Sequence, residues 1–75
     1  MTVKEIIGKV FQIDPDELDD SSSRETIEGW DSMGHLNLIL GLESEFKVNI
    51  AIADAMEMIS VEKIRAILSR YGIVC

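Results

Sequence analysis

Apolar residues near the N-terminus recur every three or four positions, which is the spacing of one face of an α-helix. They are Val3, Ile6, Ile7, Val10 and Phe11. Thr2 stands three residues before Glu5, and this is the spacing of a capping box, in which each side chain caps the other residue's backbone. The pattern predicts a core-facing helix of about ten residues that begins after Thr2.

A polar and acidic segment follows this first helix. Pro15 disfavours a helical conformation at Asp14, and the neighbouring acidic residues suit a short capped turn. Leu18 and Ile27 are expected to anchor the segment on the core, and Gly29 is expected to end it. The segment therefore forms a long first loop, and a loop of this kind in a compact domain usually has a functional reason.

The strongest helical pattern begins at Ser32 and ends near Phe46. One apolar stripe has the spacing of a face that packs on other helices. It consists of His35, Leu38, Ile39, Leu42 and Phe46. A second stripe, formed by Met33, Leu36 and Leu40, lies nearer the side of Ser32 and is broken by polar residues. This second stripe is either buried because the helix is central to the bundle, or exposed as a docking strip for a partner.

The remainder of the chain predicts two further helices. Residues 48–53 alternate as a strand does, but no second strand pattern is available to pair with them, so we expect a packed loop. Asp54 is the expected N-cap of a short helix ending at Met58, and Ser60 is the expected N-cap of the last helix, with Gly72 just beyond its end. The apolar residues of the last helix are Val61, Ile64, Ile67, Leu68 and Tyr71.

Length and composition place these elements in one domain, residues 1–75. The chain is 47% hydrophobic with a single Pro and a single Cys, so it is neither disordered nor a disulfide scaffold. An all-α bundle of four helices with a long first loop and a short third helix is the expected fold. No apolar run approaches the roughly 20 residues that span a bilayer, and the N-terminus lacks a secretory signal, so we expect a cytoplasmic protein without membrane insertion. Cys75, at the end of the chain, is expected to have no role.

The net charge of −7 argues against nucleic acid as a partner and favours basic proteins. Residues 14–31 contain eight acidic residues and one basic residue, Arg24, so this segment carries the whole net charge. Two interpretations stay open. The acidic segment either steers a basic partner toward Ser32, or is an ordinary solvated loop.

Ser32 is the residue with the most evident chemical potential. It lies where the acidic loop becomes the second helix, and the first N–H groups of a helix, together with its dipole, favour a phosphate group. Asp31 can serve as the N-cap of the same helix. The sequence therefore predicts that Ser32 is exposed and suited to carry a phosphodiester.

Two stretches of the chain resemble the acyl carrier proteins. They are Trp30-Asp31-Ser32-Met33 and Leu42-Glu43-Ser44-Glu45-Phe46-Lys47-Val48. The resemblance covers essentially the whole chain and implies the four-helix carrier fold. It also implies that Ser32 carries a covalent 4′-phosphopantetheine derived from coenzyme A, with Asp31 in a supporting role, which would make the chain a phosphoprotein.

The resemblance further implies a carrier with no enzymatic activity and no metal of its own. Acyl or related carboxylic-acid intermediates are held as thioesters on the arm, and a separate phosphopantetheinyl transferase attaches that arm with Mg²⁺ and coenzyme A. The expected partners are this transferase, an acyl- or aminoacyl-loading ligase, and downstream enzymes with basic docking surfaces; the carrier is expected to be a monomer. The expected partner contacts are Met33, Leu36, Leu40, Glu43 and Glu45.

Two departures from the family pattern bear on the pathway. Carriers of fatty acid synthesis usually present acidic residues early in this helix, where the present chain has Gly34 and Asn37. The Trp30-Asp31-Ser32-Met33 form looks more like discrete carriers of specialised lipid or polyketide pathways than like the housekeeping carrier. An aminoacyl- or peptidyl-type carrier and a non-enzymatic acidic interaction domain are the alternatives.

Two other types of site are disfavoured by the sequence. His35 and Asp31 complete the residue types of a hydrolase triad with Ser32, but no G-x-S-x-G turn or preceding strand is present, so His35 is expected to face the core or line a pocket. Several oxygen-bearing residues match the spacing of a calcium-binding EF-hand loop. They are Asp14, Asp16, Asp20, Ser22 and Glu25. Leu18 and Asp19 occupy the positions where a ligand oxygen and a glycine are required, which leaves at most weak association with divalent ions.

Overall fold

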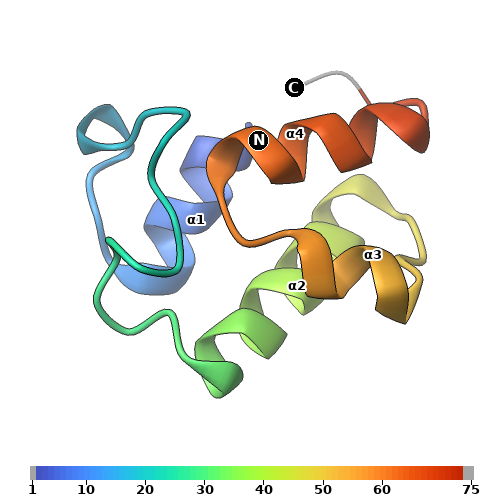
Figure 1. Ribbon diagram of the computed structural model, residues 1–75. Helices are drawn as coiled ribbons and strands as arrows, with labels where there is room; N and C mark the ends of the chain where they lie inside the picture. The colour runs from blue at the N-terminus through green and yellow to red at the C-terminus, as the bar shows by residue number, and fades with distance from the viewer. Residues whose placement is uncertain (1, 74–75) are drawn as a thin grey trace.

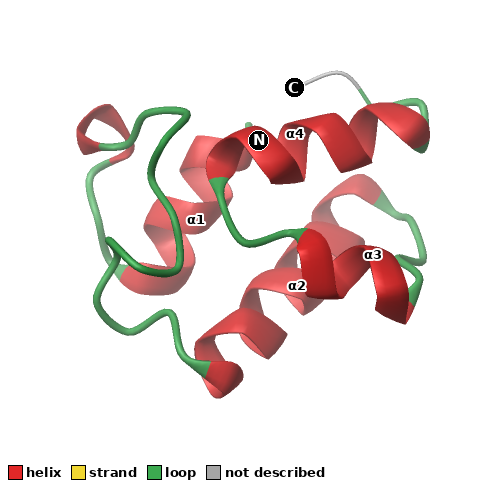
Figure 2. Ribbon diagram, viewed as in Figure 1, coloured by secondary structure: helices red, strands yellow, loops and turns green. Residues whose placement is uncertain are grey.

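Four α-helices make up most of the described part of the chain, residues 2–73, in the computed structural model (Figures 1 and 2). They are α1 (Val3–Phe11), α2 (Ser32–Phe46), α3 (Ile52–Glu57) and α4 (Val61–Arg70), and a 3₁₀ helix, η1 (Pro15–Glu17), follows α1. No strand occurs within these residues. The prediction of an all-α, four-helix fold with a long first loop and a short third helix is confirmed. The expectation for Cys75 concerns a residue outside the described part.

The first helix begins as the sequence predicts. Thr2 Oγ1 accepts a hydrogen bond from the Glu5 N–H (3.2 Å), and Glu5 Oε1 accepts one from the Thr2 N–H (3.0 Å). Hydrogen bonding of the carboxylate by Thr2, first through its backbone N–H and then through its side chain, lowers the pKa of Glu5. At the other end Gln12 adopts a left-handed conformation, and the Ile13 N–H donates to the Gly8 carbonyl (2.9 Å).

The core collects apolar side chains from three helices and from the connections between the helices. The buried members are Val3, Ile6, Ile7, Leu18, Ile27, Trp30, Leu38, Ile39, Leu42, Ile50, Met58, Val61, Ile64, Ile67 and Leu68. The predicted inner stripe of α2 is thus buried at its centre, while His35 and Phe46 at its ends are half-buried. Leu18 and Ile27 anchor the first loop, as expected. α3 itself contains no fully buried residue.

The first loop is held by its own polar groups and by the start of α4. Asp14 caps η1 by accepting from the Asp16 N–H (2.9 Å), and Asp20 forms an ion pair with Arg65 (2.7 Å). A hydrogen bond from the Ser21 hydroxyl lowers the pKa of Asp19. Two of the carboxylates that matched the spacing of a calcium loop, Asp14 and Asp20, therefore have local structural roles. Across residues 2–73 no cluster of three or more acidic, His or Cys side chains is arranged to hold a metal ion.

The start of the short third helix differs from the prediction. α3 begins at Ile52, its N-cap Ala51 offers no side-chain hydrogen bond, and it ends at Glu57, with Met58 as the C-cap. Asp54 lies inside the first turn, and its Oδ2 accepts the hydroxyl hydrogen of Tyr71 (2.5 Å). The prediction that Asp54 is the N-cap is therefore wrong, because its carboxylate bonds instead to Tyr71, the C-cap of α4.

The last helix has both of its predicted ends. Ser60 Oγ accepts from the Lys63 N–H (3.1 Å). Gly72 has a φ of +80°, and the bonds from Gly72 to Ser69 (3.1 Å) and from Ile73 to Leu68 (3.1 Å) close a Schellman motif. The longest of the helices is α2, with 15 residues, and no helix in the described range has the length and apolarity needed to cross a membrane.

Candidate functional site

Ser32 is the first residue of α2, at the point where the first loop ends (Figure 1). Its side chain is exposed. Asp31 is the N-cap, and its Oδ1 accepts from the Gly34 N–H at 2.8 Å. The N-cap role of Asp31 leaves Ser32 at the helix N-terminus, where backbone N–H groups without intrahelical partners and the positive end of the dipole are found. This is the environment that the sequence predicted for an attached phosphate.

Trp30 fixes the segment that leads to Ser32. Its side chain is only 3% exposed, and its ring stacks on Phe11 of α1 with a centroid separation of 5.3 Å. Trp30 and His35 occupy the N′ and N4 positions of α2, which are the positions of a hydrophobic staple. This anchoring role of Trp30 was not predicted from the sequence, although the staple spacing of Trp30 and His35 indicates it.

His35 links the start of α2 to α3. The indole Nε1–H of Trp30 donates to His35 Nδ1 (3.0 Å), and His35 Nε2 lies 2.7 Å from the Ala55 carbonyl oxygen. The imidazole is half-buried, as expected for a core-facing or pocket-lining histidine. Because each ring nitrogen already has a partner, neither is available as a base for Ser32, and the arrangement does not form a hydrolase triad.

Gly34 is required by the close approach of the first loop to α2. A Cβ atom at this position would meet the Gly29 carbonyl oxygen and would lie 2.8 Å from an atom of the Phe11 ring. Gly29 itself has a φ of +90°. The absence of an acidic side chain at position 34 therefore has a structural cause, since no larger residue fits between the loop and the helix.

The second apolar stripe of α2 is on the surface. Met33, Leu36 and Leu40 are 67%, 51% and 53% exposed. The exposure excludes the alternative in which this stripe packs inside the bundle. Of the two acidic residues assigned to partner contact, Glu43 is half-buried and accepts from the Ile50 N–H (2.9 Å), while Glu45 is exposed. Glu43 therefore has a structural role in the loop before α3, and a partner role for either residue stays a prediction.

The third helix adds exposed apolar surface that was not predicted from the sequence. Ile52 and Met56 of α3 are 80% and 72% exposed. The bond between His35 and Ala55 places α3 beside the first half of α2. A six-residue segment gives too short a periodic pattern to reveal an exposed face, which is why this surface was missed.

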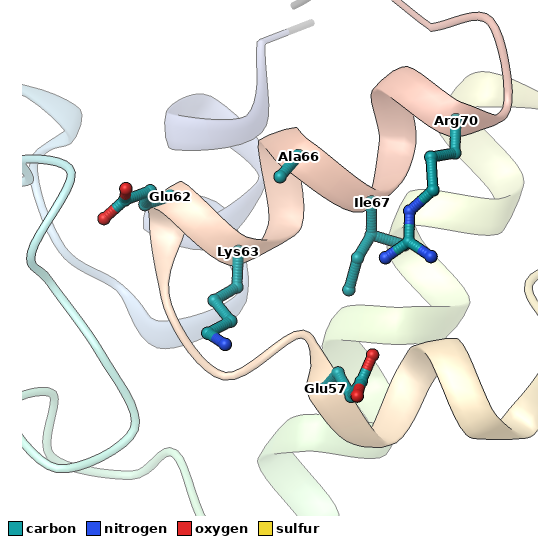
Figure 3. Close-up of a pocket in the computed structure, with 6 residues that line it drawn as sticks. All are labelled: Glu57, Glu62, Lys63, Ala66, Ile67 and Arg70. Atoms are coloured by element: carbon teal, nitrogen blue, oxygen red, sulfur yellow. The ribbon is translucent and has the colours of Figure 1, made fainter.

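A separate groove of about 290 Å³ lies on α4 and the end of α3 (Figure 3). Its lining consists of Glu57, Glu62, Lys63, Ala66, Ile67 and Arg70. Acidic and basic side chains both line it, and it contains no residue of α2. The groove is therefore not part of the Ser32 site.

Comparison with known proteins identifies the family. The family model described as "Phosphopantetheine attachment site" matches residues 2–68. The solution NMR structure of a holo acyl carrier protein from Geobacter metallireducens is similar, with a TM-score of 0.79 and 28% sequence identity over 91% of this chain and 78% of that one. A search of curated protein sequences finds no match. This chain belongs to the acyl carrier protein family, whose cofactor is a covalently attached 4′-phosphopantetheine.

Proposed function

We propose that this chain is a carrier whose 4′-phosphopantetheine arm is attached to Ser32 and holds acyl or related carboxylic-acid intermediates as thioesters. One observation carries the proposal: Ser32 is the exposed first residue of α2, on a segment fixed by the Asp31 cap and by buried Trp30. An accessible hydroxyl on a rigid backbone suits modification by a second protein.

The residues around Ser32 fit the attached group. The Ser32 hydroxyl oxygen forms the phosphodiester, and the N-terminal N–H groups of α2 stabilise the negative charge of the phosphate. When attached, the arm supplies a thiol on a flexible chain.

The carrier provides no base for the attachment step, which agrees with the engagement of both His35 nitrogens elsewhere. A transferase with bound Mg²⁺ and coenzyme A supplies that chemistry. Asp31 adds a charged group that the transferase recognises beside the serine.

The partner surface of the carrier combines an apolar face with flanking charge. Its apolar face consists of Met33, Leu36 and Leu40 of α2 with Ile52 and Met56 of α3. Exposed apolar patches mark protein contacts, and the acidic segment 14–31 adds attraction for basic surfaces. The partners are the transferase, a loading ligase and downstream enzymes that receive the cargo.

The early part of α2 supports a specialised pathway. Position 34 cannot hold an acidic residue for steric reasons, and Asn37 is an exposed neutral residue. Enzymes that recognise this carrier therefore meet a less charged helix than the enzymes of housekeeping fatty acid synthesis do. On this basis we assign the carrier to a specialised lipid, polyketide or related biosynthetic pathway, as opposed to housekeeping fatty acid synthesis.

Intact-mass measurement tests the proposal. Apo protein is incubated with coenzyme A, Mg²⁺ and a broad-specificity phosphopantetheinyl transferase. Wild type and the matched control Ser44→Ala, which removes another exposed serine of α2, are each expected to gain one phosphopantetheine mass. Ser32→Ala is expected to gain none. An unmodified wild type would contradict the carrier function, and a modified Ser32→Ala would place the attachment elsewhere.

A further inference from the structure

His35 contacts two segments that are far apart in the sequence. Its Nδ1 accepts from Trp30 in the loop before Ser32 (3.0 Å), and its Nε2 lies 2.7 Å from the carbonyl oxygen of Ala55 in α3. Ser32 lies between Trp30 and His35 along the chain. The hydrogen bond between the Trp30 and His35 side chains therefore spans the backbone segment that carries Ser32.

The chemistry of these partners fixes the state of the imidazole. An indole N–H is a donor only, so Nδ1 must be the bare acceptor nitrogen, and a carbonyl is an acceptor only, so Nε2 must carry the hydrogen. Both bonds form only with the neutral Nε2–H tautomer. A ring protonated at both nitrogens would place its Nδ1–H against the indole N–H of Trp30.

The contact extends through a row of rings to α1. Trp30 is stacked on Phe11, with a centroid separation of 5.3 Å and an interplanar angle of 25°. Its ring meets the His35 ring edge to edge through the Nε1–H···Nδ1 bond, with a centroid separation of 6.2 Å and an interplanar angle of 18°. The row Phe11, Trp30, His35 therefore connects α1, the Ser32 segment and α3. Trp30 is buried, so a displacement of the row would disturb the core.

α3 depends on such external contacts for its position. It has six residues, no side-chain N-cap bond and no fully buried residue. A helix this short is unstable alone, because nucleation is costly and few internal hydrogen bonds offset it. Side-chain hydrogen bonds join both halves of α3 to the rest of the described chain. Tyr71 holds the first half through Ala51 and Asp54, and His35 holds the second half through Ala55.

We infer that His35 is a positioning residue for the attachment site, which holds the Ser32 segment and α3 in one fixed arrangement so that both are presented together to partner enzymes. This rests on the proposed carrier function. The exposed apolar residues of α2 and α3, including Met33 and Met56, lie on the two elements that His35 joins. A partner that contacts both elements meets a preorganised surface only while the two bonds are intact.

Loss of His35 should therefore weaken recognition more than chemistry. The hydrogen bonds of the His35 ring go to Trp30 and Ala55, so kcat of modification at Ser32 by the transferase should change less than about twofold. The KM for the apo carrier should rise about two- to tenfold, which is the size of effect expected when neutral hydrogen bonds that preorganise a binding surface are lost. A residue with a structural role alone would not separate KM from kcat in this way.

Three substitutions separate the two bonds. His35→Leu removes both while keeping an apolar side chain. His35→Gln keeps an amide N–H that can reach the Ala55 carbonyl. Trp30→Phe removes the indole N–H and keeps a ring on Phe11. Ile64→Val is the matched control, because it lowers stability by trimming a buried residue of α4 that forms no part of the row.

Two spectroscopic measurements accompany the kinetics on the intact apo chain. The ¹⁵N shifts of the imidazole should show a bare Nδ1 and a protonated Nε2 in wild type. Amide hydrogen exchange of residues 52–58 should be faster in His35→Leu, should return toward wild type in His35→Gln, and should stay near wild type in Ile64→Val once global unfolding is accounted for.

The outcomes distinguish this inference from the carrier function. A KM in His35→Leu equal to that of Ile64→Val, or unchanged exchange in α3, would overturn the positioning role while modification of wild type still supports the carrier function. Failure of wild type to be modified would overturn the carrier function, and α3 exchange would still decide whether His35 holds that helix. A protonated Nδ1 in wild type would contradict the bonding on which the inference depends.

Discussion

At the scale of single residues, the site depends on Gly34, a position where only glycine fits. Gly34 allows the Gly29 carbonyl and the Phe11 ring to approach α2, and the Gly34 N–H is also the donor to the Asp31 cap. The attachment segment therefore packs closely on the helix that follows it. A side chain at position 34 would displace the loop that delivers Ser32.

Gly34→Ala is expected to lower the free energy of unfolding by about 1–3 kcal/mol, because the added methyl group overpacks a closed contact. Gly41→Ala, in the same helix, is the control. Its Cβ would lie 3.6 Å from Ile6 and 3.8 Å from Val10, which is ordinary contact, so this change should stabilise by up to about 1 kcal/mol. Urea unfolding measures both, and equal effects would show that the approach at Gly34 is looser than described.

Two substitutions of Asp31 separate its cap from its charge. Asp31→Asn keeps an oxygen that accepts from the Gly34 N–H and should stay within about 0.5 kcal/mol of wild type, whereas Asp31→Ala should lose about 1 kcal/mol. Both remove the carboxylate, so both should raise the KM of the transferase if it recognises that charge. A wild-type KM in Asp31→Asn would leave Asp31 with the capping role alone.

At the scale of elements, α3 is the helix that its own interactions stabilise least. Tyr71 anchors its start, because the hydroxyl donates to Asp54 Oδ2 (2.5 Å) and accepts from the Ala51 N–H (3.1 Å). The bond to Asp54 raises the pKa of Tyr71, and the bond from Ala51 opposes this effect. The folded protein therefore holds the Tyr71 proton more tightly than the unfolded chain does.

This pKa shift predicts a pH dependence at the alkaline end. The stabilisation from Tyr71 is fully present below the unfolded pKa of about 10 and is lost as the pH rises through the higher folded pKa. Tyr71→Phe should thus be less stable than wild type at pH 7, and the difference should shrink above about pH 10. Denaturant unfolding across this range measures it, and a constant difference would contradict the bond to Asp54.

A helix end could be predicted from the sequence when nearby residues determine it, and not when a residue far along the chain does. Thr2 and Ser60 begin helices through hydrogen bonds from nearby backbone N–H groups to their side chains, and Gly72 ends one through local backbone bonds, so a short sequence pattern was enough to place them. The start of α3 was misplaced because Ala51 has no capping side chain and Asp54 bonds to Tyr71, 17 positions away. The link between His35 and Ala55 was missed for the same reason, since it joins residues 20 positions apart.

At the scale of the whole molecule, charge and apolar surface are distributed unevenly. The segment 14–31 carries the net charge of −7, and it leads directly to Ser32. Of the six large exposed apolar residues in the described chain, five lie on α2 and α3, and Ile59 lies in the connection to α4. The proposed function therefore predicts that a basic partner is attracted first by the loop, at long range, and then contacts the apolar face at short range.

Two substitutions, each of which removes one negative charge, test whether the acidic segment attracts the partner at long range. Glu28→Gln removes a charge from the acidic segment, and Glu62→Gln removes one from α4; both side chains are exposed. At low salt, Glu28→Gln should raise the transferase KM about two- to threefold more than Glu62→Gln does. The difference should vanish near 1 M salt, where the Debye length is about 3 Å. Equal effects at low salt would show that the acidic segment is only a solvated loop.

Localisation of the modification on the chain tests the central claim most directly. Trypsin cleavage after Arg24 and Lys47 releases residues 25–47 as one peptide, which contains both Ser32 and Ser44. After incubation with coenzyme A and a transferase, fragmentation of this peptide by mass spectrometry is expected to place one phosphopantetheine on Ser32. An unmodified peptide, or a phosphopantetheine on Ser44, would contradict the account.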